Sequence, residues 1–304
     1  MWQIDTIGAQ GVLYDVAILD ENNIWAVGEI YLRDANGQID PLLYNVARWD
    51  GTKWNVQRVT VDFRGNLITP ELEGTFLFSS TDIWLVGSLP IHGDGSTWQI
   101  FDLRAMPGLE SISLSKAWGT SSDDIYFVGR NGSIAHYNGS SWQKIESGTD
   151  TEFRDIHGSG SIILSVASSS DETVIQSLSG GVAIDTLSWP NERRANGIWV
   201  SPAKKVFAAG DGVWQHVSAE WLRANGPASV FYTAIRGNAD NDIVTAAWGG
   251  NLAHYNGYTW MSYPEIPQTL NFRSLAMKGH LVVAVGFIGT VTIENAAILM
   301  GRRN

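Results

Sequence analysis

Histidines are the first residues whose type and spacing suggest chemistry, because an imidazole can bind a metal or transfer a proton. Four of the six, His92, His136, His216 and His254, share one register, two residues before an expected hairpin turn. A metal site needs ligands that converge, whereas one histidine in each repeat spreads them along the chain. We therefore expect structural or surface roles for the histidines, no metal site and no cofactor.

Carboxylates offer a second chemistry, since glycoside hydrolysis needs a pair of them about 5–9.5 Å apart. Asp123, Asp124, Asp240 and Asp242 occupy turn positions in the repeats. The remaining candidates are Glu71, Glu73, Asp94, Glu110 and Asp211. They leave open an alternative function, that of a glycoside-active enzyme of the hydrolase type with carboxylates at the mouth of a central channel.

Arginines suggest a third chemistry, because a sialidase-type site needs several of them around a substrate carboxylate, beside a Tyr–Glu nucleophile pair. The segment 272–275, Phe-Arg-Ser-Leu, lacks the proline of the sialidase arginine motif, and no Tyr–Glu pair stands out. Phosphate-binding glycine loops, nucleophile elbows and His-Glu-x-x-His motifs are also missing. We therefore favour a protein without catalytic activity. The arginines in question lie in different repeats: Arg64, Arg104, Arg130, Arg154, Arg194 and Arg273.

The segment 120–149 shows which elements must position these residues. Residues 125–128, Ile-Tyr-Phe-Val, predict a strand buried on both faces, and residues 133–137 predict a second strand. Asn138 and Gly139 tolerate the positive φ of a tight hairpin, and Trp142 begins the returning strand. One such unit cannot bury both of its faces, so it must stack on similar units.

The Val-Gly that ends the buried strand, or its equivalent, recurs through the chain at Gly28, Gly87, Gly129, Ala167, Gly210, Ala247 and Gly286. Four-stranded units about 40–45 residues long are typical of propeller blades. The sequence therefore predicts an all-β fold, a single seven-bladed β-propeller of four-stranded antiparallel blades over residues 1–304. The expected repeats are 12–60, 72–104, 113–149, 153–188, 194–225, 231–266 and 271–304, the last completed by 1–8.

The completion of the last repeat predicts how the propeller closes. Residues 2–8 align with residues 142–148, the last strand of the third repeat. Residues 2–8 therefore correspond to a last strand that lacks the three strands before it. The end of the chain supplies those three. We therefore expect residues 2–7 to pair antiparallel with residues 297–302, which removes an exposed sheet edge.

The repeats resemble a Trp-rich β-propeller repeat of exported bacterial proteins, of the form D-I-Y-x-V-G-x-x-G-x-I-x-H-Y-N-G-x-x-W. The third and sixth repeats match it almost completely, and the resemblance covers essentially the whole chain. Such proteins are often labelled glucosyltransferases or relatives of the Asp-box hydrolases. No residue here supports a transferase, and residues 94–98, Asp-Gly-Ser-Thr-Trp, lack the spacer of the Asp-box. The resemblance implies an exported protein whose leader is absent from this chain.

Six tryptophans share the register at the start of a last strand: Trp2, Trp54, Trp98, Trp142, Trp221 and Trp260. They could be platforms for stacking sugars, but an identical register in successive blades favours packing between blades. Burial of one indole contributes up to about 4–6 kcal/mol. We therefore interpret these tryptophans as structural.

Composition excludes several classes of protein. The net charge of −11 argues against nucleic-acid binding, which requires a basic patch. No apolar run approaches the roughly 20 residues of a membrane span, and the absence of cysteine excludes disulfides and thiol chemistry. We expect a monomer.

The longest irregular connections are residues 29–43, 61–72 and 101–110, which strand alternation places at one end of the sheets. Irregular loops on a rigid scaffold are where binding usually occurs. We therefore predict a non-catalytic scaffold that binds a glycan or protein partner through one face. The candidate binding residues are Tyr31, Arg33, Asp34, Arg64, Glu71, Arg104, Arg130 and Trp248.

Overall fold

The computed structural model describes residues 2–190, 193–224, 230–290 and 293–302. In these ranges the chain forms seven four-stranded antiparallel sheets, numbered here first to seventh in chain order, and one additional two-stranded sheet. This arrangement confirms the all-β, seven-bladed β-propeller fold. The first sheet consists of β2 (Gln10–Asp20), β3 (Asn23–Tyr31), β4 (Tyr44–Trp49) and β5 (Trp54–Gln57). The second consists of β8 (Gly74–Ser79), β9 (Asp82–Gly87), β10 (Leu89–Gly93) and β11 (Trp98–Ile100). The third consists of β12 (Leu114–Ser121), β13 (Asp124–Gly129), β14 (Ile134–Tyr137) and β15 (Trp142–Lys144).

The fourth to sixth sheets follow the same order of strands. The fourth consists of β16 (Phe153–Ser159), β17 (Ile162–Ser168), β18 (Thr173–Ser179) and β19 (Val182–Leu187). The fifth consists of β20 (Ala195–Val200), β21 (Val206–Gly210), β22 (Gly212–Val217) and β23 (Glu220–Arg223). The sixth consists of β24 (Tyr232–Ala239), β25 (Asp242–Ala247), β26 (Leu252–Tyr255) and β27 (Trp260–Ser262).

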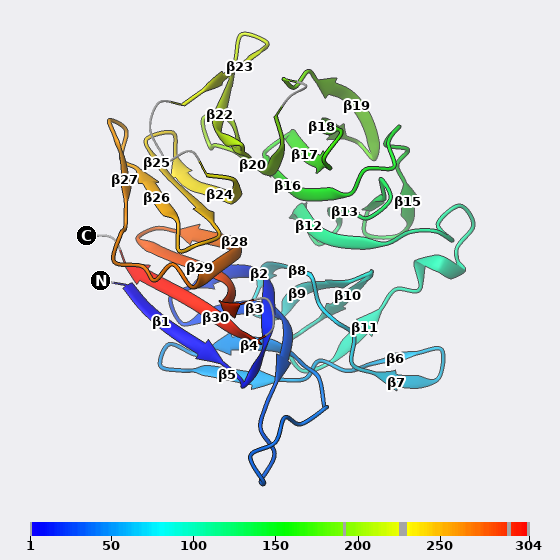
Figure 1. Cartoon of the computed structure of the whole chain (residues 1–304). Coiled ribbons are helices and arrows are strands. Elements are labelled where there is room, and N and C mark those ends of the chain that lie inside the picture. The colour runs from blue at the N-terminus through cyan, green and yellow to red at the C-terminus, as the bar shows by residue number, and fades with distance from the viewer. Residues whose placement is uncertain (1, 191–192, 225–229, 291–292, 303–304) are drawn as a thin grey trace. The chain divides into compact units, whose positions relative to one another are not determined.

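The seventh sheet joins the two ends of the chain. It consists of β28 (Leu270–Lys278), β29 (Leu281–Thr290), β30 (Ile293–Arg302) and the first strand of the chain, β1 (Trp2–Ile7). Figure 1 shows β1, in dark blue, alongside β30, in red. The predicted antiparallel pairing of the first and last strands is confirmed, although the partners of residues 2–7 are 296–301, one residue earlier than expected.

Two compact units divide the chain. Residues 1–101, 248–250 and 264–304 form the first unit, which contains the first, second and seventh sheets. Residues 102–247 and 251–263 form the second unit, which contains the third to sixth sheets. The sequence-based assignment of residues 1–304 to one domain stays a prediction.

The hydrophobic core of each unit lies between successive sheets, because short apolar strands are buried on both faces. In the first unit, Ile24 of the first sheet packs with Val283 and Ile298 of the seventh. In the second unit, Phe207 of the fifth sheet belongs to the same cluster as Ile243 of the sixth.

Most of the aligned tryptophans also pack on other rings. Their centroids are separated from those of a neighbouring ring by 5.4 Å (Trp54 and Trp49), 5.8 Å (Trp98 and Trp25), 4.8 Å (Trp142 and Tyr137) and 4.8 Å (Trp221 and Trp189). The contact of Trp98 with Trp25 joins two sheets, whereas Trp54 and Trp142 pack within their own sheets, so the rings are structural but do not all pack between blades.

The hairpin turn at residues 138–141 differs from the expectation. Gly139 has a positive φ of 84°, as predicted, but Asn138 does not belong to the residues with positive φ. Its side-chain oxygen instead accepts hydrogen bonds from the amides of Ser140 and Ser141, at 3.1 and 2.9 Å. Asp50 caps its own turn in the same way. The shared Asn/Asp-Gly pair therefore acts as a side-chain cap followed by a left-handed glycine.

The long connections contain structure that the sequence analysis treated as irregular. Residues 61–68 form the two-stranded sheet of β6 (Val61–Phe63) and β7 (Asn66–Ile68). A short 3-10 helix, η1 (Leu103–Ala105), lies in the connection 101–110.

Candidate functional site

A repeated β-bulge at the start of a first strand positions the candidate site. In six sheets, the pairing between the first and second strands skips one residue near the beginning of the first strand. A bulge leaves that residue out of the ladder and redirects its side chain. The residues skipped are Tyr14, Ser115, Arg154, Asn196, Thr233 and Arg273.

Tyr14, at the bulge of β2, forms a hydrogen-bonded pair with an acid on the adjacent strand. Its hydroxyl donates to Oε1 of Glu29 in β3 at 2.9 Å, and both side chains are half-buried. The prediction that the chain has no notable Tyr–Glu pair is therefore wrong. The two residues are far apart in sequence, and the pairing of β2 with β3 brings them together.

Electrostatics connects this pair to three further residues. Burial is the largest cause that raises the pKa of Tyr14, followed by the hydrogen bond to Glu29 and the negative charge of Glu29. The negative charge of Glu71 raises this pKa further, and the positive charge of Arg273 lowers it. Burial and the charges of Glu29 and Glu71 also raise the pKa of Tyr31. Both tyrosines therefore remain neutral phenols that can donate a hydrogen bond at physiological pH.

Arg273, at the bulge of β28, lies against two aromatic rings. Its Cζ is 5.1 Å from the ring centroid of Trp248 and 5.6 Å from that of Phe287. Asn271, at the start of β28, forms a β-bridge with Trp248, whose side chain is 50% exposed. Within the described ranges, the exposed guanidinium makes no hydrogen bond or ion pair with another residue. Stacking therefore holds the arginine while its N–H groups face no protein acceptor.

We call this group the Arg273 cluster, and it lies entirely in the first unit. It consists of Tyr14, Glu29, Tyr31, Glu71, Trp248, Arg273 and Phe287.

Three of the eight predicted binding residues, Tyr31, Glu71 and Trp248, belong to this cluster, and three others of the first unit have local contacts. Arg33 donates to the carbonyl oxygen of Gly37 at 2.7 Å, and Asp34 accepts from two amides of its own loop. Arg64 lies in the turn between β6 and β7, where its guanidinium is 5.1 Å from the ring centroid of Phe63. Whether these residues bind a partner stays a prediction.

The remaining two, Arg104 and Arg130, belong to the second unit and also have local partners. Nε of Arg104 donates to the carbonyl oxygen of Ile112 at 3.0 Å. Nε of Arg130 lies 3.8 Å from Oε1 of Glu152, and both side chains are partly exposed. These contacts stabilise loops, and they do not by themselves form a binding site.

Three of the candidate hydrolase carboxylates outside the cluster, Asp94, Glu110 and Asp211, accept hydrogen bonds from backbone amides. Hydrogen bonds from the amides of Thr97 and Ser96 lower the pKa of Asp94, and amide hydrogen bonds also lower that of Glu110. Asp211 accepts from the amide of Arg194 at 3.0 Å. A general acid in glycoside hydrolysis needs a raised pKa, so Asp94 and Glu110 are unsuited to that role.

The aligned histidines are engaged within their own sheets. His92, His136 and His254 each bond through Nε2 to an aspartate, at 2.9, 2.8 and 2.8 Å. His92 and His136 also stack on an aromatic ring of the adjacent strand, at 4.3 and 4.2 Å between centroids. His216 packs on Trp221, 5.0 Å away. Over the part of the chain that the structure describes, no three such residues form a group able to hold a metal ion.

The sequence does not predict Tyr14, Glu29 and Arg273 as members of one site. A usable signal was present, because each bulge residue directly follows a buried apolar residue at the start of a repeat. Leu13 precedes Tyr14 and Phe272 precedes Arg273 in this way. A polar or amphipathic residue recurring at that position marks the bulge.

Comparison with solved structures supports the fold. The chain is similar to YCF48 bound to D1 peptide, with a TM-score of 0.74 and 15% identity over 100% of this chain and 97% of the other. It is also similar to YCF48 from Cyanidioschyzon merolae, with a TM-score of 0.70 and 14% identity over 99% of this chain and 98% of the other. The WD40 β-propeller domain of Doa1 matches with a TM-score of 0.69 and 13% sequence identity, over 100% of this chain and 98% of the other.

Sequence comparison adds no family to this result. No model of a protein family matches the chain, and no curated protein matches it. At these identities the structural likeness shows the fold alone, so membership of the Trp-rich repeat family stays a prediction, as does export. No helix among the described residues has the length and apolar character needed to cross a membrane.

Proposed function

We propose that this protein is a non-catalytic binding module that holds a segment of a partner protein on the Arg273 cluster. The observation that carries this proposal is the stack of Arg273 on Trp248. It presents a half-exposed indole and an exposed guanidinium whose N–H groups have no acceptor among the described residues. Tryptophan, tyrosine and arginine are the residues that most often dominate the affinity of protein interfaces.

The rest of the cluster suits an extended polypeptide. The phenol of Tyr31 can donate a hydrogen bond to a peptide, whereas the proton of Tyr14 is already donated to Glu29 and only its oxygen can accept. The carboxylates of Glu29 and Glu71 can accept hydrogen bonds from backbone amides. Arg273 can donate to a backbone carbonyl or an acidic side chain. The comparison with YCF48 bound to D1 peptide is consistent with this class of partner, although that peptide is a ligand of YCF48.

One observation favours a second candidate, a glycoside-active enzyme. Tyr14 and Glu29 form the Tyr–carboxylate pair that a sialidase-type nucleophile requires, and the charge of Arg273 acts on the same tyrosine. Two features weaken this candidate. The raised pKa of Tyr14 disfavours the phenolate. Among the described residues of the first unit, Arg273 is the one arginine whose charge acts on Tyr14.

Panning a random-peptide display library against the purified protein tests the proposal. We expect selected peptides to lose at least about tenfold in affinity on Trp248→Ala or Arg273→Ala, the effect of removing an interface residue worth about 1.4 kcal/mol or more. Lys53→Ala is the control, because Lys53 is an exposed cation on a capped turn of the same unit. Selected peptides that bind both cluster variants as tightly as the wild type would refute the proposal.

A hydrolysis screen with aryl glycosides, including sialosides, tests the second candidate in parallel. Activity that Tyr14→Phe abolishes, without a change in melting temperature, would establish the enzyme and overturn the non-catalytic function.

A further inference from the structure

A cavity of about 400 Å³ lies between the fifth and sixth sheets of the second unit. One wall is aromatic, formed by Tyr255, Tyr258 and Trp260 of the sixth sheet and its last turn, and Phe207 of the fifth sheet also lines the space. Tyr258 is 91% exposed and Trp260 is half-buried. The volume is within the range of small-molecule sites, roughly 300–1,000 Å³.

Trp260, which lines the cavity, packs within its own sheet as Trp54 and Trp142 do, and differently from two other counterparts. In the second sheet, Trp98 crosses to the first sheet and lies 5.8 Å from Trp25, which occupies the position equivalent to Phe207. In the fifth sheet, Trp221 is buried against Trp189. Trp260 instead lies against Tyr255 of its own sheet, with 5.3 Å between centroids and 35° between planes. Tyr255 and Trp260 also pack on the core shared by the fifth and sixth sheets, and both rings line the cavity.

Polar side chains line the cavity beside the aromatic ones. Nζ of Lys205 lies 3.0 Å from Oδ2 of Asp240, and Gln215 supplies an amide. Arg223 also lines the cavity, so these groups together offer several hydrogen-bond donors and carboxylate and amide acceptors. A purely apolar ligand would bury these groups without hydrogen-bond partners, which is unfavourable.

We infer that this cavity binds a pyranose sugar. A pyranose has apolar ring faces that can lie on Trp260 and Tyr258, and hydroxyl groups at its edge that can bond to Lys205, Asp240 and Gln215. Both kinds of surface are present in a space of suitable size. The site is in the second unit and uses no residue of the Arg273 cluster. The sugar-binding inference can therefore be tested independently of the proposed peptide-binding function.

Saturation-transfer NMR with methyl glycosides of glucose, galactose, mannose and N-acetylglucosamine tests the inference on the full chain. We expect transfer to at least one glycoside, and we expect Trp260→Leu to weaken its binding about tenfold, the loss associated with removing one aromatic contact. Leu222→Trp, which adds an indole at an exposed position of the cavity wall, should block binding without removing any core contact.

Trp142→Leu is the matched control. Trp142 occupies the same register in the third sheet and packs on Tyr137, but it does not line the cavity. We expect this variant to bind the glycoside as the wild type does. No transfer to any glycoside would overturn the inference. Unchanged binding by folded Trp260→Leu and Leu222→Trp variants would do the same, as would equal losses in Trp142→Leu and Trp260→Leu.

Discussion

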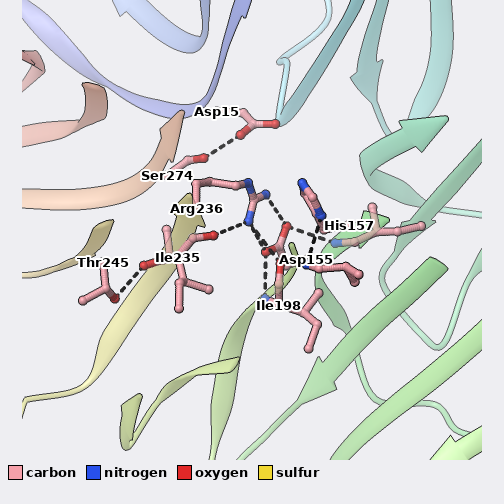
Figure 2. A network of polar contacts seen from close by, with 11 residues as sticks. Asp15, Asp155, His157, Ile198, Ile235, Arg236, Thr245 and Ser274 are labelled. Carbon is pink, nitrogen blue, oxygen red and sulfur yellow. Dashed lines mark hydrogen bonds and ion pairs between the residues drawn. The ribbon is translucent and has the colours of Figure 1, made fainter. Parts of the chain in front are cut away.

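Removal of the Asp155 carboxylate is expected to destabilise the second unit strongly. Asp155 on β16 accepts two hydrogen bonds from the guanidinium of Arg236 on β24, both at 2.8 Å, and one from the amide of Ile198 on β20 at 3.0 Å. Figure 2 shows this carboxylate facing the guanidinium. One side chain therefore links the fourth, fifth and sixth sheets.

The expected magnitude follows from burial. The side chain of Asp155 is 8% exposed and that of Arg236 is 21% exposed. Breaking a buried pair by removing one partner costs about 3–5 kcal/mol, because the remaining charge is left without compensation. Asp155→Ala should therefore lower the melting temperature of the second unit by about 6–20 °C. Arg236→Met should cost less, because the carboxylate retains the amides of Ile156 and Ile198 as donors.

A double-mutant cycle measured by thermal and urea unfolding isolates the interaction. The double variant Asp155→Ala/Arg236→Met should lose less free energy of unfolding than the two single variants lose together, by about 0.5–3 kcal/mol. Asp171→Ala, at an exposed turn, is the control and should change stability by less than about 0.5 kcal/mol. Additive single effects, or a cost below about 1 kcal/mol for Asp155→Ala, would show that the carboxylate does not link these sheets energetically.

Three further predictions concern pH, the closing strand and activity. Burial, and secondarily the charge of Arg236, lowers the pKa of His157 well below 6.5. As the pH falls, the unfolded chain therefore binds a proton at His157 before the folded chain does, and the free energy of unfolding decreases below about pH 6.5. Urea unfolding between about pH 7.5 and 5 should show a smaller decrease in the free energy of unfolding for His157→Gln than for the wild type. An identical decrease would contradict this reasoning. Deletion of residues 1–8 removes the partner of β30 and should lower the melting temperature markedly, whereas an unchanged value would show that the pairing adds little. Finally, the purified protein should not turn over nucleotide sugars, since the sequence has no phosphate-binding loop or βαβ pattern; turnover that a single substitution abolishes would refute this.

The repeats made most of the fold predictable from sequence. Buried apolar strands, capped turns and aligned tryptophans are local patterns, and they located the sheets and the pairing of β1 with β30. The one-residue error in that pairing arose because alignment with the third repeat cannot fix a register between distant strands. Residues 61–68 were read as an irregular connection because strands as short as β6 and β7 carry too few residues to show alternation.

The candidate site was only partly predictable, for a different physical reason. Tyr31, Glu71 and Trp248 could be chosen because they stand in or beside connections. Tyr14 and Arg273 stand at the start of first strands, and the residues beside them are buried. Their side chains reach the site because a bulge redirects them, and a bulge depends on the pairing of two strands rather than on the alternation within one.

The shared seventh sheet has a consequence for synthesis of the chain. β1 is made before its partner β30, and at about 5–20 residues per second the interval between them is roughly 15–60 s. During that time Trp2–Ile7 has no partner within its own chain and presents backbone donors and acceptors to any other strand. A chain that terminates before residue 293 never acquires the partner. We therefore expect such fragments to associate, either by exchanging β1 with a second copy or by aggregating through it.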